Sequence, residues 1–396
     1  MKILLITILF FSFTTHADII SDSAQFLSSD SLKGRSAGTI GNKKARDYLL
    51  HKMQELGLET SVHSFGKGKN LIGIIRPKNK NVSDLPQVIL GAHFDHVNHC
   101  KSSRLAKSKT CNGAADNSAA VAAVLGAVEI LKKTATQTIA IIFWDAEEKG
   151  LLGSRAFANS PTFDLSETKL YINLDIIGLN LFRGMESHSF IIGAESGGQE
   201  LMNQVDRVSQ ESALNFHQLT YGFAHYRSDM TSFVINNRKI PFVFFTDGDG
   251  KVYHSSADEF EFLNLDKVRA IASTISKLAN TAAAPETAFP YRQPTILLGN
   301  RGPGLVIGPF LGLRNGLVLP LHKDVAAIKK LTQELLELAE KNQFSAGTRN
   351  SLLKNINTLD AYEKEGPENF GKMRGMKIML MTKNLLDLSK KLKFIP

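Results

Sequence analysis

The apolar positions of this chain fall into two alternating patterns over its first 285 residues. Short runs that are apolar almost throughout predict strands, and these lie at 71–77, 87–93, 137–145, 169–178 and 241–247. Longer segments with helical spacing lie at 41–57, 118–133, 197–212, 228–237 and 266–283. Strands without polar alternation, separated by helices, are typical of a sheet that is covered on both faces. The pattern therefore predicts an α/β fold, a three-layer α/β/α sandwich around a mostly parallel mixed central sheet.

The pattern changes beyond residue 285, where proline and glycine become frequent. Farther along, one helix is marked by Val325, Ile328, Leu331, Leu335 and Leu338, and at least one more helix follows. We therefore divide the chain into a signal segment (1–17), a main domain (18–285) and a C-terminal segment with a small helical appendage (286–396).

The first residues predict export. The stretch "MKILLITILFFSFTTHA" has one lysine, then an apolar run, then a small-x-small cleavage position at Thr15-His16-Ala17. The mature chain is expected to begin at Asp18, in the periplasm or outside the cell. An uncleaved anchor is the alternative, but the apolar run is short for a span of roughly 20 residues. No other stretch approaches that length, so we expect no membrane span after the signal is removed.

The charge is uneven along the chain. Its net value is +9, and residues 301–396 hold 16 Lys and Arg against 9 Asp and Glu. Such a surplus of positive charge could bind an anionic surface, but the charged faces of lysine-rich helices are more often simply exposed to solvent. No nucleic-acid motif accompanies the charge, so no nucleic-acid partner is predicted. The oligomeric state is not indicated.

The two cysteines, Cys100 and Cys111, lie eleven positions apart. In an exported protein such a pair is a candidate disulfide that closes a small loop. Two free thiols or two soft metal ligands are the alternatives, although a C-x10-C spacing is not a metal signature by itself.

Polar side chains gather where the apolar runs end. They are His93, Asp95 and His96; Asp116 on the following loop; Glu147 and Glu148; Asp175; and Tyr253, His254 and Asp258. Each has an ordinary explanation as a cap, a turn or a satisfied polar group. Because the carboxyl ends of parallel strands meet at one sheet edge, however, the imidazoles and carboxylates are expected to converge there. So many carboxylates could not all stay ionised without cations, and this donor set suits Zn²⁺. Two ions about 3.5–4 Å apart would neutralise them.

The order of the local patterns is specific. It reads H-x-D, G-x-x-D-N, E-E-x-G-L-x-G-S, N-x-D and Y-H-x-x-x-D. This order resembles the di-zinc aminopeptidase family, which includes secreted bacterial leucyl aminopeptidases and, more distantly, glutamate carboxypeptidase II. The resemblance covers roughly residues 25–284, with "LKGRSAGTIGNKKARDYL" at its start and "YRSDMTSF" before the last strand. It makes 18–285 a zinc exopeptidase catalytic domain.

The resemblance implies two Zn²⁺ ions and a set of five metal ligands. His93 and Asp175 would hold one ion, Glu148 and His254 would hold the other, and Asp116 would bridge the two. The family often has a second aspartate before the bridging one, where this chain has Ala115.

The resemblance also implies three further roles at the site. Glu147 would be the general base that takes a proton from the attacking water, and Tyr253 would donate to the developing oxyanion. Asp95 would orient the imidazole of His93. The two adjacent glutamates would thus have different roles, since Glu148 would bind metal and Glu147 would accept and donate protons.

The implied activity is hydrolysis of the N-terminal peptide bond of peptides with a free N-terminus. Carboxypeptidase relatives grip a carboxylate with arginines, and no such arginine is assigned, although Arg155 and Arg227 lie near motif residues. One alternative is a glutaminyl-cyclase-like aminoacyl transferase with one zinc. Another is a non-catalytic binding relative, as transferrin receptor is.

Overall fold

The computed structural model describes residues 18–294, except 80, 181–184, 225 and 249–251, and a few isolated positions beyond 294. The predicted signal segment (1–17) and the five apolar positions expected to mark a helix from Val325 to Leu338 lie outside the described residues. The division of the chain at 285 stays a prediction.

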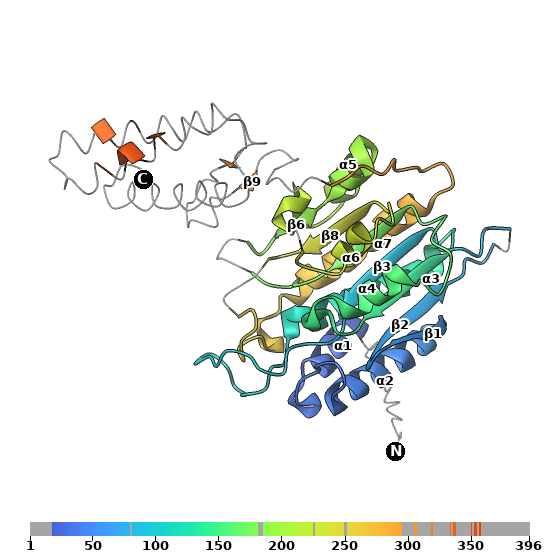
Figure 1. The fold of residues 1–396 in the computed structure, drawn as a ribbon, viewed down its shortest axis with the longest axis horizontal. Coiled ribbons are helices and arrows are strands. Elements are labelled where there is room, and N and C mark those ends of the chain that lie inside the picture. The colour runs from blue at the N-terminus through green and yellow to red at the C-terminus, as the bar shows by residue number, and fades with distance from the viewer. Residues whose placement is uncertain are drawn as a thin grey trace, which may run out of the picture.

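An eight-stranded mixed sheet forms the centre of the described domain (Figure 1). Its order is β1-β2-β4-β3-β5-β8-β6-β7. The strands are β1 Glu59–Phe65, β2 Gly68–Ile75, β3 Val88–His93, β4 Ile139–Trp144, β5 Leu170–Leu174, β6 His188–Ile192, β7 Asn215–Leu219 and β8 Phe242–Thr246. The central strands β4, β3, β5 and β8 are parallel, whereas β1, β2 and the β6–β8 pair add antiparallel contacts. The predicted mostly parallel mixed sheet is confirmed.

Helices cover both faces of the sheet. They are α1 Ile19–Leu27, α2 Ile40–Glu55, α3 Ala119–Thr134, α4 Leu152–Asn159, α5 Gly198–Gln210, α6 Met230–Ile235 and α7 Leu265–Ala283. Strand β4 shows why its sequence is apolar throughout. Ile141 and Phe143 pack in the core under α1, α2, α3, α5 and α7, while Ile142 and Trp144 pack in a second core under α4 and α6. Both side-chain sets are buried, so the three-layer sandwich is confirmed.

Within the described residues, one helical stretch, Ala114–Thr134, is long and apolar enough to cross a membrane by composition. In its most apolar window, 89% of the residues are buried inside the molecule. It is therefore a core helix, whose apolar surface packs against α1 and α7.

The sheet topology determines where the functional residues meet. His93 is the last residue of β3, Asp175 directly follows β5, and Glu147, the third residue after β4, begins a short 3-10 turn, Glu147–Lys149. Because β4, β3 and β5 are neighbours and parallel, their carboxyl ends share one edge. The loop that follows β8 returns His254 to this edge, where Asp116 also lies.

Candidate active site

One group of candidate metal donors lies at the ends of β3 and β5. His93 Nε2 is 3.2 Å from Asp175 Oδ1 and 3.4 Å from Asp116 Oδ1. All three side chains are buried. His93 Nδ1 lies 3.2 Å from the backbone carbonyl of Asp95, to which it can donate a hydrogen bond. That hydrogen bond leaves Nε2 as the nitrogen that faces the two carboxylates.

A second group shares Asp116 with the first. Oδ2 of Asp116 is 3.1 Å from His254 Nε2, which is also 3.0 Å from Glu148. A third imidazole belongs to this group, since His96 Nδ1 lies 3.1 Å from Glu148 Oε1. The two oxygens of Asp116 therefore face different groups, which is the arrangement that a bridging carboxylate needs.

The donor atoms fit zinc. Tetrahedral nitrogen and oxygen ligands at 2.0–2.1 Å from one Zn²⁺ lie about 3.3 Å from each other, and the contacts in both groups scatter around that value. Asp116 Oδ2 is also buried and makes no well-formed hydrogen bond to the described residues, although His254 Nε2 lies 3.1 Å away. A buried carboxylate oxygen without hydrogen bonds is costly, and a cation would satisfy this one.

The loop that carries Asp116 is held by Asp258, which lies four residues after His254. The carboxylate of Asp258 accepts hydrogen bonds from the backbone N–H groups of Ala115 at 2.8 Å and Asp116 at 3.1 Å. Burial raises the pKa of Asp258 to about 6. Ala115, where relatives often have an aspartate, does not interrupt this hydrogen bonding. The resemblance listed Asp258 only as part of a motif, and its contacts identify it as the residue that positions this loop.

Asp95 positions the two neighbouring glutamates. Its Oδ1 accepts the Glu147 N–H at 2.9 Å, and its Oδ2 accepts the Glu148 N–H at 3.3 Å. The turn is possible because Ala146 adopts a left-handed backbone conformation, with φ at 57°. The carboxylate of Asp95 also lies 3.5 Å from His93 Nδ1. A single side chain thus connects the end of β3 to the turn after β4.

The two glutamates have different electrostatic surroundings. Burial raises the pKa of Glu147 well above its usual value, and His93 only partly opposes that shift. Burial acts on Glu148 in the same direction, but its contacts with His254 and His96 hold its pKa well below the usual value. Glu148 is therefore ionised and turned toward the second donor group. Glu147 points elsewhere, with Oε2 4.0 Å from His93 Nε2.

Four of the candidate donors, His93, Asp116, Glu148 and Asp175, line a cavity of about 290 Å³. Glu147 and Tyr253 line it beside the donors, and the Tyr253 ring stacks on His254 with ring centres 3.9 Å apart. The rest of the lining is mainly apolar and comes from Ile176, Phe190, Ile192, Leu219, Phe223, Ala224 and Phe244. Arg227 also lines the cavity, whereas Arg155 does not.

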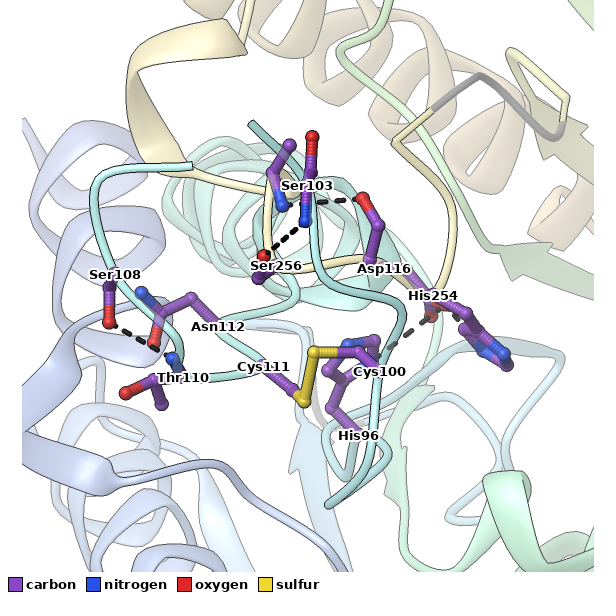
Figure 2. The surroundings of a disulfide bond; sticks show 12 residues. His96, Cys100, Ser103, Ser108, Thr110, Cys111, Asn112, Asp116, His254 and Ser256 are labelled. Atoms are coloured by element: carbon purple, nitrogen blue, oxygen red, sulfur yellow. Dashed lines mark hydrogen bonds and ion pairs between the residues drawn. A yellow bond between two sulfur atoms is a disulfide. The ribbon is translucent and has the colours of Figure 1, made fainter. Parts of the chain in front are cut away.

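The predicted disulfide between Cys100 and Cys111 is present (Figure 2). It closes the loop that joins His96 to Asp116. Lys101 in this loop donates its N–H to the His254 carbonyl at 2.8 Å and accepts the Ser256 N–H at 2.8 Å. The closed loop, which joins His96 to Asp116, is therefore hydrogen-bonded to the segment that carries His254.

Three residues near the site received no role from the sequence. His96 was noticed only as a strand-end residue. Arg35 is fully buried and donates to the carbonyls of Leu27, Phe94, Asn112 and Gly113. Asp229 is also buried, and its burial, only partly opposed by His93, raises its pKa to about 7. The only indication of Arg35 and Asp229 in the sequence was that the segments "GRSAG" and "RSDM", which contain them, belong to the stretches that resemble the family.

Comparisons with known proteins agree with this architecture. The chain is 30% identical over 167 residues to a vacuolar membrane protease of Lodderomyces elongisporus, covering 36% of this chain and 16% of that protein. It is 27% identical over 169 residues to the aminopeptidase YwaD of Bacillus subtilis, covering 42% of this chain and 34% of that protein. The chain thus spans about a third or less of the length of these relatives.

Two solved structures share the fold. The LapA aminopeptidase of Legionella pneumophila matches with a TM-score of 0.55 and 19% identity, over 68% of this chain and 74% of that one. A glutaminyl cyclase of Porphyromonas gingivalis matches with a TM-score of 0.52 and 18% identity, over 66% of this chain and 98% of that one.

The profile of peptidase family M28 matches residues 70–279, more than half of the chain. This region runs from the second strand of the sheet to its last helix and includes every candidate metal donor described above. The family predicted from the motif order is therefore confirmed, and the chain belongs to peptidase family M28.

Proposed function

We propose that this protein is a zinc-dependent aminopeptidase that hydrolyses the N-terminal bond of peptides. The observation that carries the proposal is that the two adjacent glutamates, Glu147 and Glu148, have different surroundings. Glu148 joins a group of candidate zinc donors, while Glu147 lines the cavity and has a raised pKa. A carboxylate with a raised pKa suits a general base, because a base works best when its pKa lies near the operating pH.

Two Zn²⁺ ions would occupy the two donor groups. His93 and Asp175 would hold one ion, Glu148 and His254 the other, and Asp116 would bridge them with its two oxygens. When bound, zinc supplies a Lewis acid that polarises the peptide carbonyl and lowers the pKa of water.

The protein's own side chains would move the protons. Glu147 would accept a proton from the attacking water on a carboxylate oxygen and pass it to the leaving amine. Tyr253, held by its stacking on His254, would donate its phenol O–H to the developing oxyanion. Asp95 would keep the base in position through the backbone N–H of Glu147.

The cavity supports a substrate with an apolar first residue. Phe190, Ile192 and Leu219 line it, and burying an apolar side chain against them is favourable. The carboxylates that line the cavity, Asp116, Glu147, Glu148 and Asp175, favour the cationic α-amine of a free N-terminus. Arg227 gives a specific reason to test a second mode, in which a peptide's C-terminal carboxylate enters the cavity.

A one-zinc cyclase is the alternative, since a glutaminyl cyclase shares the fold. The presence of donors for a second ion argues against it, because an intramolecular aminoacyl transfer needs neither a full second donor group nor a hydrolytic water. A non-catalytic binding role would not need Glu147 or the donors either.

We also propose that the protein is exported to the periplasm or beyond. The N-terminal signal pattern and the disulfide support this location. N-terminal sequencing of the mature protein after cell fractionation should begin at Asp18 in the exported fraction. An uncleaved chain retained in the cytoplasm would contradict it.

The activity is tested with matched peptides that have free or acetylated N-termini and free or amidated C-termini. We expect cleavage only with a free N-terminus, no effect of C-terminal amidation, and loss of cleavage after chelation. Equal cleavage of the acetylated peptides, or full activity without metal, would overturn the proposal. Loss of cleavage on amidation would instead favour the carboxypeptidase mode.

A further inference from the structure

We propose that His96 is an additional zinc ligand, acting through Nδ1, in the donor group formed by Asp116, Glu148 and His254. This proposal rests on the zinc binding proposed above and extends the set of five ligands that the motifs imply. It makes the two zinc positions unequal, because one would have four protein donors and the other three.

The first argument is the burial of His96. The side chain is fully buried, and neither ring nitrogen makes a well-formed hydrogen bond to the described residues, although Nδ1 lies 3.1 Å from the Glu148 carboxylate. An imidazole buried without hydrogen bonds costs free energy. A zinc ion bound at Nδ1 would satisfy one nitrogen and offset that cost.

The second argument is the direction and distance of Nδ1. It lies 3.1 Å from Glu148 Oε1 and 3.8 Å from Asp116 Oδ2. These distances bracket the separation of about 3.3 Å between two ligands of one tetrahedral zinc ion. His254 completes the group, with Nε2 3.1 Å from Asp116 Oδ2, and the four donor atoms all lie within 4.8 Å of one another.

The third argument is that the imidazole is held in this position. It meets the ring of His254, with ring centres 5.7 Å apart and planes at 73°. It also lies against the backbone at Gly113, where a Cβ atom would be only 2.5 Å from Cγ of His96. Gly113 also has a φ of 59°, which favours glycine. The disulfide loop that begins at Cys100 leaves directly from this segment, as Figure 2 shows.

The consequence is a difference in affinity between the two ions. Four protein donors fill a tetrahedral zinc shell, as in structural zinc sites, whereas three leave a position open. The ion held by His96 should therefore bind more tightly and exchange more slowly. The ion held by His93 and Asp175 should be the one with room for water.

The test measures zinc binding by calorimetry and chelator competition, with no activity assay. The variants are His96→Ala, His96→Phe and, as the control, His99→Ala, which changes an exposed histidine three residues farther along. Both His96 variants should bind one of the two ions at least 10-fold more weakly, while the control and the wild type keep both affinities. The phenylalanine variant separates ligation from packing, because it fills the space of the imidazole without a donor.

Zinc X-ray absorption supplies a readout that packing alone would not change. The doubly loaded wild type should show three imidazoles shared by two ions, and the His96 variants should show two. Wild-type affinities in His96→Phe, or an unchanged imidazole count, would overturn the inference and leave the aminopeptidase proposal intact. Failure of the wild type to bind two ions would overturn both.

Discussion

Nε of Arg35 donates a 3.0 Å hydrogen bond to the carbonyl of Phe94, 59 residues away in the sequence. Phe94 stands between His93 and Asp95, so this bond links the N-terminal loop to the first motif of the site. The same guanidinium reaches the carbonyls of Asn112 and Gly113, which precede Asp116. Although burial lowers the pKa of Arg35 to about 10, the carboxylates of Asp116, Asp258 and Asp95 oppose that shift, and the group stays charged at neutral pH.

Arg35 should therefore contribute strongly to stability and to zinc affinity. Removing one member of a buried network of charged groups typically costs about 3–5 kcal/mol, so Arg35→Ala should lower the free energy of unfolding by roughly that amount. Urea unfolding of the metal-free protein measures this, with the exposed Arg104→Ala as the control. A change below 1 kcal/mol would mean that the four carbonyls find other partners.

Glu147 and Glu148 should give opposite results when each is changed to alanine. Glu147→Ala should cut kcat about 10²–10⁴-fold and keep both zinc ions, because a general base acts in the transition state. Glu148→Ala should lose zinc from one position. Metal analysis and peptide hydrolysis on the same samples measure both effects, and Glu261→Ala, at an exposed ion pair, is the control. Loss of zinc from the Glu147 variant would reverse the assignment.

Zinc binding should release protons at neutral pH. Burial alone would lower the pKa of His254. Its contacts with Asp116 and Glu148 outweigh burial and raise that pKa to about 10 in the metal-free protein. The imidazole is then protonated at pH 7, and a metal at Nε2 must displace that proton. Affinity should therefore rise with pH toward 10 and fall as the pH drops. Calorimetry in buffers of different ionisation enthalpy counts the protons, and a pH-independent affinity would refute this prediction.

The disulfide should stabilise the domain and the second donor group together. Replacing both cysteines with serine should lower the free energy of unfolding by about 2–3 kcal/mol for a loop of this size. Because the loop joins His96 to Asp116 and is hydrogen-bonded to the His254 segment, zinc affinity should fall as well. Denaturant unfolding and zinc titration test the two effects. Two titratable thiols in the unreduced, denatured wild type would show that the bond is absent.

The sequence predicted five strands that correspond to β2, β3, β4, β5 and β8. It overlooked β1 and β7 at the two edges and also β6, a buried strand that lies next to β7. Strand β3 is apolar throughout because helices cover both of its sides. Strand β1, with the sequence "ETSVHSF", lies at the sheet edge and is half exposed, so no apolar run marks it. Strand β7, at the other edge, was overlooked for the same reason.

The candidate site was predictable where a motif ends a buried strand, as at His93 and Glu148. The surroundings of His96 were not, because its distance to Glu148 depends on how the loop up to Cys111 folds back. Arg35 was not predictable either, since its partners are backbone carbonyls, which no side-chain pattern displays.

The shared edge of β4, β3, β5 and β8 has a consequence for the order of folding. The donors that meet there come from His93 to His254, so each pairing closes a long stretch of chain and is slow to form. A chain that stops before β8 and its following loop lacks His254, so it cannot complete the second donor group. Zinc can therefore bind in full only after β3, β4, β5 and the loop that follows β8 have come together, and the metal then stabilises the folded domain over its partly folded precursors.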